Sequence, residues 1–388
     1  MQGLPTKLAR LLLICALCIS GGGVSAADLD ASIDALLAID KEGKGHDDAA
    51  PLLRSLVQQP PSALVPLLHG MDRANPLAAN WFRGAFESIA DRNLSSGSLP
   101  QQDLEAFVLD RSHAADARQL AFDWLVKIDA TAADRLVPGM ADDPSTEFRR
   151  AGVQRLLDAA AKAKESQDST ASKELYGQAF RAALDPDQLD LAFDELTALG
   201  EQPDLKKQLG LLSNWWMIGP FDHRNGIGFN AAYPPETEIE LQKKYAGTES
   251  EVSWTEKTTD HRHALLDLNN LLGHHKGAVA YAYQEFESDR DQPVEIRLGT
   301  PNGWKLWVNG EPVFAHEEYH QSSRLDQYRT PVALKAGTNR ILLKICQNEQ
   351  TQDWAQRWEF QLRVCDELGT AVLPTAAAST DAAKVSQK

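Results

Sequence analysis

The sequence predicts an α+β multidomain protein: an N-terminal α-helical region of repeat or solenoid type, followed by an antiparallel β-sandwich. Residues 27–210 are rich in Ala, Leu, Asp, Arg and Gln, and their apolar positions recur three and four apart, as in amphipathic helices. Residues 211–369 alternate aromatic or β-branched residues with polar ones between Gly, Pro and Asn-Gly turns, which is typical of strands. The change between the two patterns is abrupt and falls at Leu211.

Helix start and stop signals recur along the first region. The segments DPSTE (143–147) and DPD (185–187) offer capping residues and a helix-initiating proline, while Gly45, Gly200 and Gly210 are typical of helix ends. The stretches 115–125 and 146–157 superimpose, and this favours a stack of helical hairpins with an extended binding surface. An ordinary irregular helical domain is the alternative.

The second region contains five clear strand candidates. These are residues 279–288, 294–300, 303–308, 339–346 and 357–365. Within the third, Trp304 shares one face with Leu306, whereas Trp307 lies on the other. Asn309-Gly310 then predicts a tight hairpin turn, because both central residues of a type I′ turn need positive φ.

Both chain ends are predicted to lie outside the folded regions. Residues 1–26 combine basic residues, a short apolar run and a small-x-small end, which indicates a cleaved signal peptide. The apolar run is shorter than the roughly 20 residues of a membrane span, and Cys18 leaves a lipoprotein as an alternative. We therefore expect an exported protein, periplasmic or extracellular, without a membrane span. Residues 370–388 are expected to form a disordered tail.

Charge and cysteine content restrict the partners and the redox chemistry. A net charge of −16 disfavours nucleic acid, which requires clustered Lys and Arg. Cys346 and Cys365 follow the signal peptide, in strands expected to pair as a hairpin. That pairing would hold the two cysteines too far apart for a disulfide, so we expect two free thiols. The sequence does not predict the oligomeric state.

The segments GWKLWVNGEPVF, LKAGTNRILLK and WEFQLRVCDELG together resemble the galactose-binding-like jelly roll, the sugar-binding domain of the β-galactosidase family. The whole chain resembles exported bacterial proteins of planctomycete type that join HEAT-like helical repeats to such a jelly roll through a W-x-I-G-P-F-D strand, here Trp216 to Asp222. The resemblance implies a fold more than an activity. The turn Thr300–Gly303 lacks the carboxylates that calcium-dependent members of related sandwich families use.

One segment matches a zinc-protease motif by letters. His316-Glu317-Glu318-Tyr319-His320 reads H-E-x-x-H, in which two histidines one helical turn apart bind zinc. Asn309-Gly310 and Pro312 lie just upstream and disfavour a helix. In an extended chain the two histidines would stand about 13 Å apart. We therefore expect a strand and a loop here.

No other motif indicates catalysis. The cluster of His261, His263, His274 and His275 lacks a third ligand of fixed position, and no nucleophile elbow or dinucleotide loop is present. The sequence therefore predicts no catalytic residue, no metal ligand and no cofactor, and the chain is expected not to be an enzyme.

Aromatic and planar polar residues of the β region are the candidate ligand-binding site. Sugar recognition combines exposed aromatic faces with polar groups that bind the hydroxyls. We expect six residues to line one rim of the sandwich: Trp307, Tyr319, His320, Arg324, Asp326 and Asn348. Packing of the aromatics in the core is the alternative.

These observations predict an exported, non-enzymatic binding or scaffold protein of the cell envelope. Its partner is expected to be a carbohydrate, a glycoconjugate or an envelope protein. The alternatives are a purely structural or protein-interaction module, and a zinc metalloprotease or other hydrolase acting through His316, Glu317 and His320.

Overall fold

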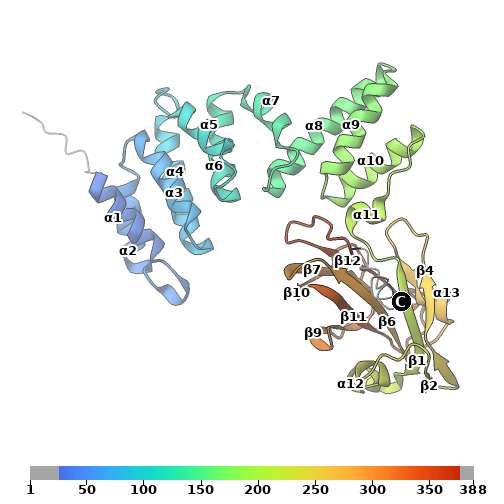
Figure 1. Cartoon of the computed structure of the whole chain (residues 1–388). Helices are drawn as coiled ribbons and strands as arrows, with labels where there is room; N and C mark the ends of the chain where they lie inside the picture. Colours follow the sequence, from blue (N-terminus) through green and yellow to red (C-terminus); the bar gives the residue numbers. More distant parts are fainter. Residues whose placement is uncertain (1–25, 376–388) are drawn as a thin grey trace, which may run out of the picture. The chain divides into compact units, whose positions relative to one another are not determined.

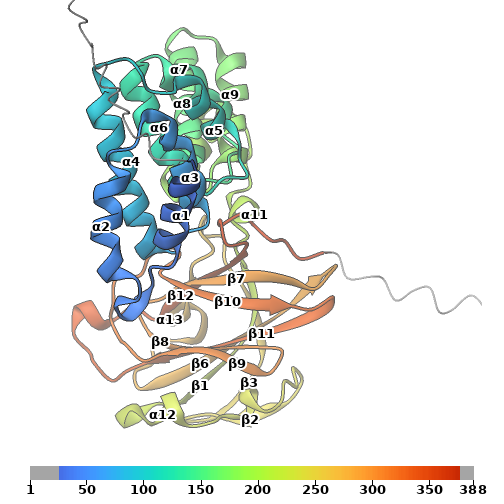
Figure 2. The same cartoon turned by 90° about the vertical axis from the view of Figure 1, so that its left-hand side faces the viewer.

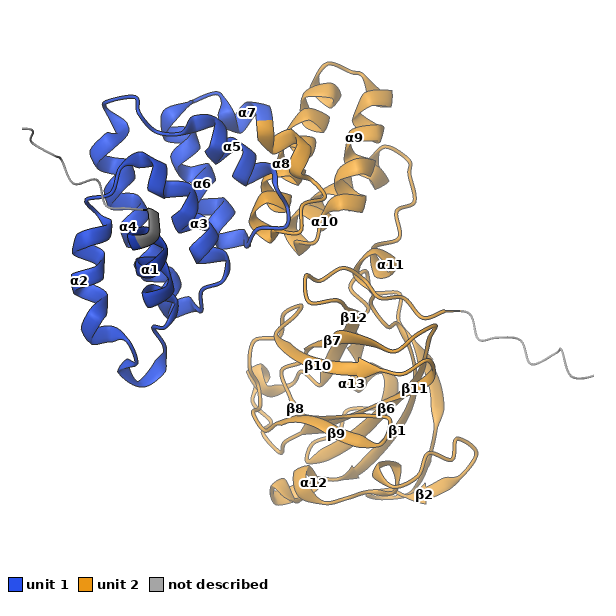
Figure 3. Ribbon diagram, turned by 60° about the vertical axis from the view of Figure 1, so that its left-hand side comes forward, with its two compact units in different colours: residues 1–135 blue, residues 136–388 orange. Residues whose placement is uncertain are grey.

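The structure is a computed structural model that describes residues 26–375 (Figure 1). Helices fill the N-terminal part and antiparallel strands the C-terminal part, which confirms the α+β arrangement. Residues 1–25 of the predicted signal peptide lie outside the described residues. So do residues 376–388 of the predicted tail. The chain divides into two compact units, Met1–Arg135 and Leu136–Lys388 (Figure 3).

Unit 1 consists of helices joined by short connections. Asn75 shows how the sequence starts one of them: its side chain accepts hydrogen bonds from the backbone N–H groups of Leu77 and Ala78, and Pro76 occupies the first helical position. The helices are α1 (Ala26–Leu37), α2 (His46–Leu56), α3 (Leu64–Asp72), α4 (Pro76–Leu94), α5 (Gln101–Leu109), α6 (Ala115–Ile128) and α7 (Ala132–Leu136), which ends at the unit boundary.

Unit 2 begins with four more helices and confirms several start and stop signals. Ser145 caps the first of them, and Gly210 closes the last in the left-handed conformation. Gly45, expected to end a helix, instead precedes α2. The helices are α8 (Thr146–Glu165), α9 (Ser169–Ala182), α10 (Pro186–Ala198) and α11 (Leu205–Leu209). No helix among residues 26–375 is both long and apolar enough to cross a membrane.

The rest of unit 2 is built around two facing antiparallel sheets. The six-stranded sheet has the order β4-β1-β6-β11-β8-β9 and the four-stranded sheet the order β10-β7-β12-β5. The strands are β1 (Asn214–Asp222), β4 (Thr255–Thr258), β5 (Leu266–Asp267), β6 (Ala278–Ser288), β7 (Gln292–Gly299), β8 (Gly303–Val308), β9 (Glu311–His316), β10 (Tyr328–Leu334), β11 (Gly337–Gln347) and β12 (Glu359–Cys365). The short helix α13 (Leu268–Leu272) follows β5.

A third layer lies on the outer side of the six-stranded sheet (Figure 2). It is formed by residues 227–254, which we call the cover segment. This segment contains α12 (Ile227–Asn230), β2 (Lys244–Ala246) and β3 (Glu251–Ser253). Side-chain alternation therefore separates two apolar clusters: Trp304 and Leu306 pack between the sheets, whereas Trp307 packs on the outer side.

The β8–β9 hairpin forms as predicted, with both Asn309 and Gly310 at positive φ. The predicted pairing of the two cysteine-bearing strands is wrong. β11 belongs to the six-stranded sheet and β12 to the four-stranded sheet, so Cys346 lies opposite Val279 and Cys365 opposite Glu295. Both thiols are free, as expected, and buried. They are kept apart because their strands belong to different sheets, not because of their positions in a hairpin.

The first residues assigned to the tail are part of the sandwich. Ala371 forms a bridge with Cys365, and the Val372 N–H donates to the carbonyl of Val364. The Thr375 N–H donates to the carbonyl of Glu287. Residues 370–375 therefore extend the ordered chain beyond the predicted boundary.

Candidate functional site

The outer face of the six-stranded sheet carries a row of side chains that crosses four strands. Strand register places Trp216 of β1 opposite Tyr283 of β6, Tyr283 opposite Leu342 of β11, and Leu342 opposite Trp307 of β8. We call these four residues the cross-strand row. With neighbouring strands about 4.8 Å apart, the row spans about 14 Å.

The cover segment buries the sheet on one side of this row. Lys344 lies in the next row and its side chain is 0% exposed. Its ammonium donates to Glu236 at 2.7 Å and to the carbonyl oxygens of Phe229 and Ala231. The hydroxyl of Tyr281 also donates to Glu236. These bonds fix the cover segment on the sheet.

Burial changes the acidity of both groups that meet Glu236. Desolvation lowers the pKa of Lys344, although the Glu236 carboxylate opposes that effect. Desolvation and the bond to Glu236 both raise the pKa of Tyr281. Glu236 is therefore engaged by two buried partners, and its place at the edge of the cover segment is fixed.

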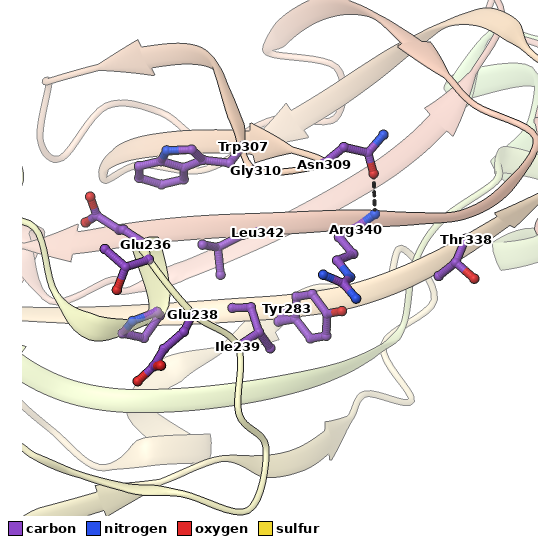
Figure 4. Close-up of a pocket in the computed structure, with 12 residues that line it drawn as sticks. Glu236, Glu238, Ile239, Tyr283, Trp307, Asn309, Gly310, Thr338, Arg340 and Leu342 are labelled. Atoms are coloured by element: carbon purple, nitrogen blue, oxygen red, sulfur yellow. Dashed lines mark hydrogen bonds between the residues drawn. The ribbon is translucent and has the colours of Figure 1, made fainter.

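On the other side of the row the sheet is not covered, and a groove of about 390 Å³ opens (Figure 4). Tyr283, Leu342 and Trp307 form its floor. One wall comes from the cover segment and the other from the β8–β9 turn and β11. The groove is lined by Pro235, Glu236, Thr237, Glu238, Ile239, Tyr283, Trp307, Asn309, Gly310, Thr338, Arg340 and Leu342. We call this cavity the sheet groove.

The groove continues along the row into a smaller cavity of about 220 Å³. Tyr283 lines both cavities, and Trp216 and Glu285 line only the second. Together the two cavities follow the cross-strand row from Trp307 to Trp216. The two cavities share Tyr283, and Leu342 lies between Tyr283 and Trp307 in the row.

Charged groups of both signs border the floor. Glu285 lies opposite Arg340 in the strand register, and both are exposed. The Tyr283 hydroxyl donates to Glu285 at 2.8 Å, and burial together with this bond raises the pKa of Tyr283. On the opposite wall Glu238 pairs with Lys243. The groove thus offers hydrogen-bond donors and acceptors on both sides of an aromatic floor.

The structure does not bring the six predicted site residues to one rim. Trp307 lies in the sheet groove and is 9% exposed. Tyr319, His320 and Asn348 lie in a separate loop cluster with Trp354. There the Tyr319 hydroxyl meets His223 Nε2 at 2.8 Å, and His320 Nε2 meets Asn348 Oδ1 at 2.7 Å.

The last two predicted residues lie elsewhere again. Asp326 accepts hydrogen bonds from Arg297 and Arg363 on the outer face of the four-stranded sheet. Arg324 is exposed two positions earlier in the same connection. Burial raises the pKa of Asp326, but the two arginines outweigh that effect and hold its pKa below the usual range. Asp326 therefore serves an internal ion-pair network.

The zinc-protease motif is divided between a strand and a loop, as expected. His316 is the last residue of β9, and Glu317 to His320 follow in the connection to β10. His316 lies 3.3 Å from Glu318, whereas His320 contacts Asn348. The two histidines therefore have different partners and do not share a helical face.

The second histidine cluster is also divided. His263 Nε2 lies 2.9 Å from Asp190 of α10, and Arg262 binds Asp190 and Asp194. His275 Nε2 lies 3.1 Å from the carbonyl oxygen of Leu272. These contacts join Arg262 and His263 to α10 and do not converge on one point with His275.

Comparisons with known proteins give no family. No family model matches the chain, and no curated protein matches it. Solved structures that match include two chains of a beta-glucosidase from Kluyveromyces marxianus, both at TM-score 0.25. The first, in complex with glucose, is 9% identical, and the match covers 39% of this chain and 16% of the beta-glucosidase chain. The second is 8% identical, and the match covers 77% of this chain and 38% of the beta-glucosidase chain.

A further match is a Bacillus thuringiensis Cry1Da tryptic core variant, 9% identical at TM-score 0.18, with 88% of this chain and 99% of that chain covered. The expectation that the chain is not an enzyme is contradicted, because two of these neighbours are enzymes by name. At TM-scores of 0.25 the likeness transfers neither a fold nor a reaction to this chain.

Proposed function

We propose that the sandwich binds a carbohydrate or glycoconjugate in the sheet groove, and that the chain acts as an exported binding or scaffold protein of the cell envelope. The observation that supports this proposal is the cross-strand row, which lies beneath an open groove of about 390 Å³. That volume falls in the usual range of small-ligand sites.

The chemistry of the groove suits a sugar. A pyranose ring has an apolar face that packs on an aromatic ring, and its edge carries hydroxyls that need planar hydrogen-bond partners. Trp307 and Tyr283 supply ring surface on the floor. Arg340 and Asn309 on one wall and Glu238 on the other supply donors and acceptors at the ring edge.

The finer fold assignment and the export route belong to the same proposal. The jelly-roll interpretation rests on the GWKLWVNGEPVF, LKAGTNRILLK and WEFQLRVCDELG segments, and the HEAT-like interpretation on the paired stretches 115–125 and 146–157. Export rests on the signal-peptide pattern of residues 1–26. In this proposal the helices present a protein-contact surface, and the sandwich holds the glycan.

A glycan array followed by calorimetry on the oligosaccharide that binds best tests the proposal. We expect Trp307→Ala and Arg340→Ala to weaken binding at least tenfold, with the fold checked by circular dichroism. Trp354→Ala is the matched control, because this tryptophan is 62% exposed in the loop cluster, apart from the groove. Loss of binding in Trp354→Ala alone would move the site to the loop cluster.

Absence of binding to any glycan would favour the alternative of a structural or protein-interaction module. In that case the cross-strand row would serve only to pack the cover segment. Trp307→Ala would then lower the melting temperature without changing any binding measurement.

A further inference from the structure

A second group of chemically active side chains lies in unit 1, outside the sheet groove. It consists of His69 and Asp72 in the last turn of α3 and His113 in the connection between α5 and α6. One ligand atom from each residue lies within 4.8 Å of the other two, and no other such group of three or more occurs among the residues that the structure describes. We propose that these three residues bind a divalent transition-metal ion such as Zn²⁺.

The fold brings the three together from distant points in the sequence. His69 and Asp72 are three residues apart on one helix, so both side chains lie on the same face of α3. Beyond α5 the chain returns to α3, which places His113 Nδ1 2.7 Å from Asp72 Oδ2. His69 Nδ1 lies 3.8 Å from the same oxygen. Asp72 thus stands between two imidazole nitrogens.

These distances are close to those of a zinc site. Zn–N and Zn–O bonds of about 2.1 Å in a tetrahedral shell place ligand atoms about 3.4 Å apart. Relative to the structure, the His113–Asp72 separation must grow by about 0.7 Å and the His69–Asp72 separation must shrink by about 0.4 Å. Rotation of His69 can supply the second change, since its side chain is 54% exposed. The first change requires a small shift of His113 or Asp72, whose side chains are 16% and 17% exposed.

Neighbouring groups hold the ligands without a metal. The His113 ring is stacked on Phe107 at a centroid distance of 3.8 Å. Asp72 Oδ1 accepts the backbone N–H of Ala114, which leaves Oδ2 facing the histidines. Without a metal, His113 Nδ1 donates to Asp72 Oδ2, because an ionised carboxylate only accepts. Metal binding at Nδ1 requires the ring proton on Nε2, which faces Asp110 Oδ2 at 3.6 Å.

The donor set selects the kind of ion. Two imidazoles and one carboxylate suit zinc, copper, nickel or iron, whereas calcium and magnesium prefer shells composed of oxygen. Three protein ligands leave at least one coordination position for water. His69 is 54% exposed, so solvent reaches the cluster and can complete the shell.

Calorimetry with ZnCl₂ on the full chain, tag-free and stripped with chelator, tests the proposal. We expect one Zn²⁺ per chain with a Kd in the micromolar range or tighter, no comparable binding of Ca²⁺, and a higher melting temperature with zinc. His69→Ala should weaken zinc binding at least tenfold. The fold should survive this change, because His69 is more than half exposed.

Two further variants complete the test. Asp72→Asn keeps an acceptor for the Ala114 N–H but removes the charge, and it should also weaken zinc at least tenfold. His46→Ala removes an exposed histidine of the same unit outside the cluster and should leave zinc binding unchanged. The proposal is overturned if the chain binds no zinc, or if His69→Ala and Asp72→Asn bind it as tightly as the original chain.

Discussion

The two outer faces of the sandwich both carry buried charged side chains, but they use them differently. On the four-stranded sheet, Arg297 and Arg363 lie directly opposite each other and share the Asp326 carboxylate. Their remaining donors reach Glu295 and backbone carbonyls, so the network is satisfied internally. On the six-stranded sheet, Lys344 and Glu236 are also paired, but the cover segment that they hold stops at the cross-strand row.

The difference shows why one face is a binding candidate and the other is not. A charged network that satisfies its own hydrogen bonds offers little to a ligand, because binding would have to break bonds already made. In the sheet groove, aromatic surface and polar walls border open space.

Removal of Asp326 should have the largest effect on stability. Arg363 is 1% exposed and Arg297 4%, so Asp326→Ala leaves two buried guanidinium groups facing each other. We expect a loss of about 3–5 kcal/mol in the free energy of unfolding, measured by chemical denaturation. The control Arg324→Ala, at an exposed position two residues away, should stay within about 0.5 kcal/mol. A comparable loss in both variants would show that the network is not the cause.

The same carboxylate should make the sandwich sensitive to acid. The pKa of Asp326 is lower in the folded chain than the value of about 3.9 in an unfolded one. Its contribution to stability is therefore complete above that unfolded value and is lost as the pH falls through the folded pKa. Denaturation curves at pH 7 and at pH values below about 4 should show the gap between the original chain and Asp326→Ala narrowing in acid. A stability difference that does not change with pH would contradict the lowered pKa of Asp326.

Glu236→Gln should have an intermediate effect. The amide still accepts one hydrogen bond, but Lys344 loses the only carboxylate that it contacts among the described residues. We expect a loss of about 1–3 kcal/mol in stability and weaker ligand binding, because this residue also lines the groove. Glu238→Gln in the same segment is exposed and should change stability by less than about 0.5 kcal/mol. Equal losses of stability in Glu236→Gln and Glu238→Gln would show that the buried Lys344–Glu236 pair is not the cause.

Arg340→Ala should have the smallest effect on stability and a selective effect on binding. This residue is exposed on β11, so its removal should change the unfolding free energy by less than about 0.5 kcal/mol. Loss of its hydrogen bonds to a sugar should weaken binding about 10- to 30-fold. Arg329→Ala, which removes an exposed arginine from the other sheet, should leave binding unchanged in the same calorimetric titration.

Sequence periodicity predicted which face a side chain occupies, but not which side chains become neighbours. The alternation of residues 303–308 predicted Trp304 and Trp307 on opposite faces, as the structure has them. In the structure Tyr283 of β6 shares the outer face with Trp307. Their position in one row depends on the register of β11 between them, which no local pattern encodes. The same limit explains the wrong pairing of the cysteine strands, because the strands from β9 to β12 alternate between the two sheets.

Loops and distant histidines were still harder to predict. Tyr319, His320, Arg324 and Asp326 are close in sequence, yet their connection carries them from the loop cluster to the opposite sheet face. Strand alternation does not set the direction of such a connection. His69 lies on α3 and His113 in the connection between α5 and α6, and only packing of α5 and α6 against α3 brings them together. No short motif in the sequence contains both.

The length of the cover segment determines the width of the sheet groove. It is inserted between β1 and β4, so its length can vary without altering the core between the sheets. The row that it hides, with Tyr281 and Lys344, lies on the same sheet surface as the groove floor. A shorter insertion would widen the groove by that row, and a longer one would close it. The length of the insertion therefore sets how much of this sheet face the groove exposes.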